Sequence, residues 1–174
     1  MMAARFGKLA WLWLSLVVIV ADQVTKHWVD ANVDLYQQIV VIPDVFSWTL
    51  AYNRGAAFSF LASESGWQRW FFAIIALAVS VVLVIWIKRL KQNETWLAIA
   101  LALVLGGAIG NLYDRIVLGH VVDFILVHWK TQWYFPAFNI ADSAITVGAV
   151  MLALDMLRGN KSANSSTTGA RSNE

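Results

Sequence analysis

Two aspartates of this 174-residue chain lie in surroundings where a carboxylate is expected to carry out chemistry. Asp123 stands in the apolar run GHVVDFILVHW, and Asp142 stands near the start of FPAFNIADSAITVGAVMLALDM. A carboxylate near lipid hydrocarbon costs about 3 kcal/mol or more, so such residues suggest a functional site. Two carboxyl groups that share one proton can activate water for attack on a peptide carbonyl, the ionised group as base and the protonated group as acid.

Asp142 also has a structural interpretation, because Asn139 is placed to cap a helix that begins at Ile140. Asp142 would then lie in the first turn, where the helix dipole favours negative charge. Buried acids also serve as proton relays in membrane transporters, although transporters usually have internal repeats and broken helices. The residues alone therefore leave three classes open: a peptidase, a small proton-coupled membrane transporter and a non-catalytic membrane scaffold.

Other catalytic chemistries fit the sequence less well. His120, Asp123 and His128 are possible metal ligands, but their spacing is not that of a recognised zinc site. We therefore expect no metal and no other cofactor. The chain has no cysteine, which excludes thiolate catalysis and disulfides, and it contains no Gly-x-Ser-x-Gly motif of serine hydrolases.

Two further acids have cations close to them in the sequence. Asp22 and Lys26 are four residues apart, which predicts a structural ion pair on one helix face. Asp114 is followed by Arg115, and both come after GGAIGNL, whose glycines form a small-xxx-small face that lets helices approach closely. Pairing and packing explain most of these features.

The elements that must position these side chains are mainly membrane helices. The chain is 59% hydrophobic and contains ten tryptophans, which is typical of a protein whose solvent is largely lipid. Its small basic excess requires no nucleic-acid partner. A bilayer is crossed by about twenty apolar residues, and four such stretches occur, at roughly 9–29, 70–87, 96–112 and 140–157. We expect one membrane domain over residues 1–158 and a disordered polar tail over residues 159–174.

The positions of lysine and arginine predict the orientation of the chain. If the chain crosses four times, one side carries Arg5, Lys8, Lys88, Arg89, Lys91, Arg158, Lys161 and Arg171. The positive-inside rule assigns that side, with both termini, to the cytoplasm. The two longer connections, 30–69 and 113–139, then lie on the outer side. Four acids are then expected in the outer half of the membrane or just above it: Asp22, Asp114, Asp123 and Asp142.

The first outer connection predicts a small β-sheet. Large and small residues alternate in VFSWTLAYN, and QQIVVI can pair with this stretch across a turn at Pro43 and Asp44. Its apolar face would contact lipid or a lipidated ligand, or else pack on the helices; it comprises Phe46, Trp48, Leu50 and Tyr52. For the second outer connection we expect a loop or a helix. The predicted fold class is a mainly α membrane protein with four transmembrane helices and a small extracytoplasmic sheet.

Five motifs in a fixed order make the prediction more specific. They are DQVTK at 22–26, NRGAAFSF at 53–60, GGAIGNLYDR at 106–115, GHVVDF at 119–124 and FNIADSAI at 138–145. Together they closely resemble bacterial lipoprotein signal peptidase, or signal peptidase II, an aspartic intramembrane peptidase family. The resemblance spans all four helices and both outer connections.

The resemblance implies a monomeric enzyme of the bacterial inner membrane, inhibited by globomycin, with its active site towards the periplasm. It would remove the signal peptide from diacylglyceryl-modified prolipoproteins on the amino side of the lipidated cysteine. The catalytic pair of the family maps onto Asp123 and Asp142. Its substrate-binding or pair-supporting residues map onto Asn53, Asn111, Asp114, Arg115 and Asn139.

Overall fold

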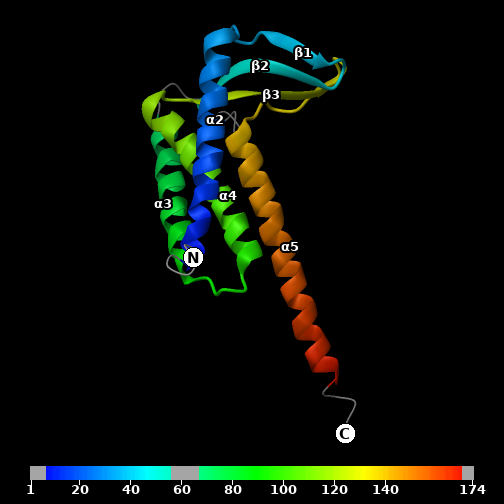
Figure 1. Cartoon of the computed structure of the whole chain (residues 1–174). Helices are drawn as coiled ribbons and strands as arrows, with labels where there is room; N and C mark the ends of the chain where they lie inside the picture. The colour runs from blue at the N-terminus through cyan, green and yellow to red at the C-terminus, as the bar shows by residue number, and fades with distance from the viewer. Residues whose placement is uncertain (1–6, 56–66, 170–174) are drawn as a thin grey trace.

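A computed structural model describes residues 7–55 and 67–169, with side chains as far as Leu157. Long helices form a bundle, and a four-stranded sheet lies at one end of it (Figure 1). In chain order the elements are η1 (Gly7–Trp11), α2 (Leu12–Asn32), β1 (Gln38–Ile42), β2 (Phe46–Asn53), α3 (Trp67–Arg89), α4 (Thr95–Val117), β3 (Val121–Trp129), β4 (Trp133–Tyr134) and α5 (Ile140–Gly169).

The four predicted membrane helices are confirmed. Four helical stretches in the described part of the chain are long and apolar enough to cross a bilayer, at Gly7–Asn32, Trp67–Arg89, Thr95–Val117 and Ile140–Leu157. Each is as long as the prediction or slightly longer, because the helices continue into polar residues at their ends. The chain is therefore a multi-pass membrane protein.

Helix α4 is the centre of the bundle. It contacts α2, α3 and α5, and 61% of its most apolar window is buried, against 17 to 22% in the other three spans. Small residues make this possible, because alanine and glycine let neighbouring backbones come close. Where α4 meets α3, a cluster of Leu83, Ile87, Leu101 and Leu105 fills the contact.

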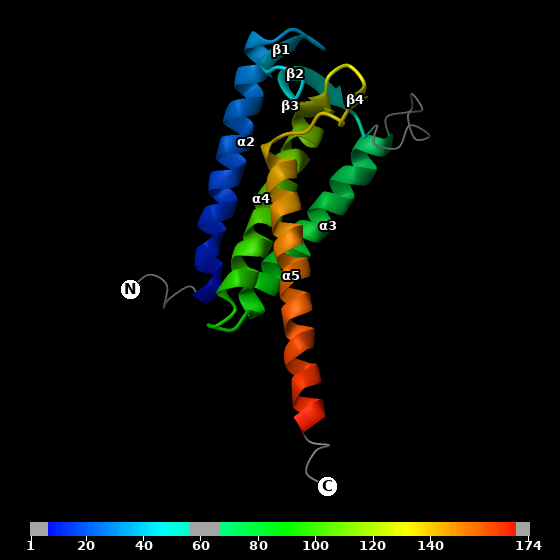
Figure 2. The same ribbon diagram turned by 90° about the vertical axis from the view of Figure 1, so that its right-hand side faces the viewer.

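The first and last described helices both extend away from the sheet. Figure 1 shows the N-terminal end of α2, the α3–α4 connection and the C-terminal end of α5 at the end of the bundle opposite the strands. The same arrangement is seen from the side in Figure 2, where the sheet covers the other end of the helices. One end of the bundle thus carries these helix ends, and the other carries the sheet and the start of α5.

The predicted hairpin of β1 and β2 is confirmed. The two strands pair antiparallel, with Val40 opposite Ser47, and the turn between them contains Asp44 in a left-handed conformation (φ 65°). The predicted alternation fails at one place, because a bulge between Trp48 and Ala51 shifts the β2–β3 register. Thr49 and Leu50 are consequently both buried.

The apolar face of β2 packs mostly on the protein itself. Leu50 is 2% exposed in a cluster with Val29 and Val33 of α2 and with Val122 and Phe124 of β3. Trp48 stacks on Phe124 with ring centroids 5.5 Å apart. The sequence left open whether this face contacts lipid or packs on the helices. The side chains of Trp48 and Leu50 pack on the protein itself.

The second outer connection differs from the prediction. We expected a loop or a helix there, and the structure has the strands β3 and β4, which complete an antiparallel sheet in the order β1-β2-β3-β4. The reason is that β3 is buried on both faces from Val121 to Phe124. Such a strand reads as a continuous apolar run without alternation, which sequence periodicity cannot separate from a helix.

Helix α5 continues past the fourth membrane span as far as Gly169. The division into a membrane domain over residues 1–158 and a polar tail after it stays a prediction. A helix that is already formed extends readily, because adding a residue to it costs far less than nucleating a new one. The segment contains no proline that would end it earlier.

Candidate active site

The first turn of α5 is built by a reciprocal cap between Asn139 and Asp142. The backbone N–H of Asp142 donates to Asn139 Oδ1 at 2.9 Å, and the backbone N–H of Asn139 donates to Asp142 Oδ2 at 3.3 Å. This is the arrangement of a capping box. The predicted cap is confirmed, and it leaves Oδ1 of Asp142 available for another donor.

Strand pairing places Asp123 beside Asn53. Ala51 of β2 lies opposite Asp123 of β3, so Asn53, two residues further along β2, is a diagonal neighbour on the same face of the sheet. Its Nδ2 donates to Asp123 Oδ2 at 3.0 Å. The rest of the NRGAAFSF motif, residues 56–60, lies outside the described residues.

A return of the chain after β4 brings the cap of α5 to the same strand. Phe138 exchanges backbone hydrogen bonds with Ile125, at 2.8 and 3.1 Å. The next residue, Asn139, therefore faces β3, and its Nδ2 donates to Asp123 Oδ1 at 2.7 Å. Asn139 is fully buried.

Asparagine amides join the two aspartates. Asn139 contacts both, through its side-chain Nδ2 to Asp123 and through its backbone N–H to Asp142. Asn111 of α4 donates from Nδ2 to Asp142 Oδ1 at 2.7 Å and accepts from Asn139 Nδ2 at 3.2 Å. Asp123 and Asp142, which are 19 positions apart in the sequence, thus belong to one hydrogen-bonded cluster at the sheet end of the bundle.

The two carboxyl groups have different surroundings. Asp123 is 2% exposed, whereas Asp142 is half-buried. Burial raises the pKa of the Asp123 carboxyl to about 7, and the nearby charge of Asp142 acts in the same direction. Hydrogen bonds from Asn53 and Asn139 and the charge of Lys26 lower that pKa only in part. A pKa near 7 is the property expected of a group that holds a proton for transfer at neutral pH.

The predicted ion pair between Asp22 and Lys26 is confirmed, and it has a third member. Lys26 Nζ lies 2.7 Å from Asp22 Oδ2 and 2.8 Å from Asp114 Oδ2. Asp114 thus pairs with Lys26 of another helix. All three residues are at most 1% exposed. Removing one partner of a buried ion pair typically costs roughly 3–5 kcal/mol, so the triad is strongly coupled to the fold.

Gln23 is a member of this cluster that we did not predict. Its Nε2 donates to Asp114 Oδ1 at 2.8 Å and also reaches Gly110 O and Asp22 Oδ2, each at 3.3 Å. One signal in the sequence was its place inside the DQVTK motif. A glutamine on a membrane helix also needs a polar partner, which offered a second indication.

Arg115 lies at the edge of the aspartate pair. Its Nη1 donates to Asn111 O at 3.1 Å, and its guanidinium lies 5.5 Å from the ring centroid of Phe72. The carboxylates of Asp142, Asp123 and Asp114 are all near enough to interact with its charge. It is half-buried and supplies a cation beside the two acids.

The predicted glycine face brings α4 against its neighbours. A Cβ on Gly106 would lie 2.9 Å from Ser15 O of α2, and a Cβ on Gly110 would lie 2.7 Å from Asp22 Oδ2. A Cβ on Gly107 would overlap Ala141 O. Close approach at these positions is what allows α2 and the start of α5 to meet beside Asn111.

The possible metal ligands do not come together. His128 lies at the far end of β3, where Nε2 is bonded to Ser47 Oγ and Nδ1 to Lys130 O, each at 3.0 Å. His120 packs on Tyr52, with ring centroids 4.1 Å apart. Within residues 7–55 and 67–157, no group of three or more histidine, aspartate or glutamate side chains is arranged to hold a metal ion.

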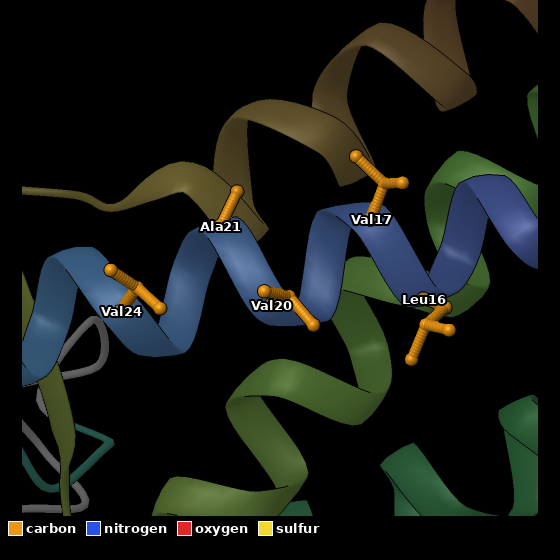
Figure 3. A pocket seen from close by; sticks show the side chains of 5 residues that line it. All are labelled: Leu16, Val17, Val20, Ala21 and Val24. Atoms are coloured by element: carbon orange, nitrogen blue, oxygen red, sulfur yellow. The ribbon is translucent and has the colours of Figure 1, made fainter.

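An apolar groove along α2 takes no part in this chemistry. It is lined by Leu16, Val17, Val20, Ala21 and Val24, and Figure 3 shows Val17 and Ala21 directed towards α5. None of these side chains is titratable. The lining of this groove therefore offers no group for acid–base chemistry.

Solved structures define the class of protein. Two structures described as bacterial membrane enzymes share this fold, with TM-scores of 0.76 and 0.75 at 30% and 32% sequence identity. The first alignment covers 87% of this chain and 89% of the other, and the second covers 85% and 92%. The chain has the architecture of a bacterial membrane enzyme.

Sequence comparison gives the family. Residues 14–158 match the family described as signal peptidase (SPase) II. A lipoprotein signal peptidase of Pseudomonas putida is 76% identical over 160 residues, which cover 92% of this chain and 94% of the relative. One from Pseudomonas fluorescens (strain Pf0-1) is 74% identical over 157 residues, covering 90% and 92%. This chain belongs to the signal peptidase II family.

The resemblance seen in the five motifs is therefore confirmed. The family is one of peptidases, so the chain is an enzyme, and neither the transporter nor the scaffold that the residues alone left open is favoured.

Proposed function

We propose that this chain cleaves the signal peptide from diacylglyceryl-modified prolipoproteins, with Asp123 and Asp142 as the catalytic pair. The observation that carries the proposal is the cluster in which Asn139 contacts both aspartates, with Asp123 buried and Asp142 partly open. The relatives are named for acting on lipoproteins, and that substrate class is extended here to this chain.

The two environments divide the roles within the pair. Asp142 lies in the first turn of α5, where the helix dipole stabilises a carboxylate, and two donors are bonded to its oxygens. Asp123 is buried and has a pKa of about 7. We assign Asp142 as the ionised base and Asp123 as the protonated acid of the resting enzyme.

The reaction follows from these roles. Asp142 takes a proton from water as the water oxygen bonds to the scissile carbonyl carbon, and Asp123 gives its proton to the carbonyl oxygen. The tetrahedral intermediate then collapses. Its C–N bond breaks, Asp142 passes its proton to the leaving amine of the lipidated cysteine, and Asp123 recovers its proton from the hydroxyl. One water is consumed, and both aspartates return to their starting states.

Neighbouring residues support this pair. Asn53 and Asn139 hold the Asp123 carboxyl from its two oxygens, and Asn111 holds Asp142. Arg115 supplies the positive charge that offsets the charge of the pair and of the developing oxyanion. Asp114 acts one step further away, through Lys26.

Exposed apolar residues of the sheet fit a lipidated substrate. All four apolar residues of β1 are exposed by 42 to 60%: Ile39, Val40, Val41 and Ile42. Trp129, Trp133 and Phe135 around β4 are exposed by 47 to 58%. Each methylene that a lipid chain buries contributes about 0.8 kcal/mol. We assign recognition of the diacylglyceryl group and of membrane lipids to these two surfaces, in place of the face of β2.

The enzyme is proposed to lie in the bacterial inner membrane with both termini in the cytoplasm and the aspartate pair on the periplasmic side. The distribution of lysine and arginine supports this orientation. We also propose that the enzyme works as a monomer.

A cleavage assay tests the proposed function. Purified enzyme is incubated with a diacylglyceryl-modified prolipoprotein and with the same protein lacking the lipid, each with and without globomycin. We expect cleavage of the lipidated form only, and its inhibition by globomycin. Equal cleavage of both forms would contradict lipid recognition, and no cleavage of either would contradict the peptidase assignment.

A further inference from the structure

We infer that Lys26 is a positioning residue for the catalytic pair, and that its triad with Asp22 and Asp114 sets the relative placement of Asp123 and Asp142. The inference rests on the proposed roles of those two aspartates. It extends the role of the Asp22–Lys26 pair beyond the structural one that its spacing predicted.

The three protons of the Lys26 ammonium match three acceptors. Besides Asp22 and Asp114, Nζ donates to Asn111 Oδ1 at 2.9 Å. An ammonium group has three donors and no acceptor, so its bonding capacity is filled. Lys26 is 1% exposed, which leaves its head group no solvent in which to move.

This third contact determines how Asn111 faces Asp142. Because Lys26 can only donate, the oxygen of the Asn111 amide must face it, and Asn139 Nδ2 donates to the same oxygen. The amide nitrogen is therefore directed at Asp142 Oδ1, 2.7 Å away. The reverse orientation would place an N–H group against the ammonium and an oxygen against a carboxylate, so Lys26 selects the donor that Asp142 receives.

The two acids of the triad are bonded to the chain beside each catalytic residue. Asp22 Oδ1 accepts the backbone N–H of Ala141, the residue before Asp142, at 2.9 Å. Asp114 Oδ2 accepts the backbone N–H of Val122, the residue before Asp123, at 3.3 Å. Lys26 lies between Asp22 and Asp114, so one ammonium connects the start of α5 with the start of β3.

The placement of the pair therefore depends on a buried charge that touches neither aspartate directly. If the ammonium were lost, Asp22 and Asp114 would repel each other across the space that it fills. The backbone positions before Asp123 and Asp142 would lose their common anchor. The expected consequence is a misplaced pair, which slows the chemical step more than it weakens substrate binding.

The test compares Lys26→Met with Lys8→Met. Lys8 is also a buried lysine, 8% exposed, and donates from Nζ to Thr95 Oγ1 at 2.6 Å, but it lies at the opposite end of the bundle. Both variants are purified, and kcat and KM for a diacylglyceryl-modified prolipoprotein are expressed per molecule of folded, monodisperse enzyme. This normalisation removes any effect on folding yield.

We expect kcat of Lys26→Met to fall by about a hundredfold or more while KM changes by less than about threefold. We expect kcat of Lys8→Met to stay within about twofold of the parent enzyme. Folded Lys26→Met with a parental kcat would overturn the inference, as would an equal loss in both variants.

A second variant is decisive if Lys26→Met does not fold. Asn111→Leu keeps both ion pairs of Lys26 but removes the oriented amide, so kcat should fall in the same way. Folded Asn111→Leu with a parental kcat would overturn the inference. Asp123→Asn and Asp142→Asn, measured in the same series, distinguish a failure of the proposed catalytic pair from a failure of the role of Lys26. If these two variants retain turnover, the assignment of the catalytic pair is wrong. If they are inactive while Lys26→Met is active, only the role of Lys26 is contradicted.

Discussion

Asn139 donates its side-chain amide to Asp123 at 2.7 Å, and it does so as the residue that caps the helix carrying Asp142. One buried side chain therefore begins α5 and contacts the neighbouring strand. The cap that begins the helix and the geometry of the aspartate pair therefore depend on the same residue. The fold allows Asp142 to be both a first-turn acid and a candidate catalytic residue.

The first prediction concerns pH. Asp123 acts as an acid only when protonated, and its pKa of about 7 means that the protonated fraction falls as pH rises through that value. We expect kcat/KM to decrease by about tenfold per pH unit on the alkaline side. The profile is measured with a substrate that has no group titrating between about pH 5 and 9, which is about two units on either side of the transition. A rate that still increases up to the end of this range would contradict the assignment.

The second prediction resolves which aspartate holds the proton. Isotope-edited infrared spectra of the resting enzyme should show a protonated carboxyl band near neutral pH that disappears in Asp123→Asn and persists in Asp142→Asn. The reason is that Asp123 is the buried member of the pair, and burial favours the neutral acid. A band that instead disappears in Asp142→Asn would show that the roles are reversed.

The third prediction uses two glycines of the bundle. A Cβ on Gly110 would lie 2.7 Å from Asp22 Oδ2, whereas a Cβ on Gly148 would lie 2.7 Å from Ala100 O, away from the pair. Each alanine should destabilise the protein by about 1–3 kcal/mol through overpacking. Only Gly110→Ala should also lower turnover per folded molecule, because it displaces a member of the Asp22–Lys26–Asp114 triad. Thermal unfolding and kcat measured together check this, and equal turnover in both variants would refute it.

The fourth prediction concerns orientation. Single cysteines are introduced into this cysteine-free chain at Gln92, between α3 and α4, and at Gln132, between β3 and β4. An impermeant thiol reagent applied from outside should label only the cysteine at 132, as the positive-inside rule requires. Labelling of the cysteine at 92 from outside would reverse the proposed topology.

The membrane helices, the β1–β2 hairpin, the cap at Asn139 and the Asp22–Lys26 pair were all predictable from sequence. Each depends on a local period, a cap or a four-residue spacing. Strand β3 could not be predicted, because burial on both faces removes the alternation of apolar and polar residues. The partner of Asp114 could not be predicted either. Lys26 is 88 positions away in the sequence, and only the close contact of α2 with α4 brings the two together.

The most direct test of the account is turnover in Asp123→Asn and Asp142→Asn, with Asp155→Asn as the matched control. Asp155 lies on the same helix as Asp142 but near the other end of the membrane-spanning stretch Ile140–Leu157, with no described contact to the pair. All three variants should insert and purify as folded proteins. The account predicts that the first two lose cleavage of a diacylglyceryl-modified prolipoprotein by about a thousandfold or more, while Asp155→Asn keeps the parental rate. Near-normal turnover by folded Asp123→Asn or Asp142→Asn would contradict the catalytic pair.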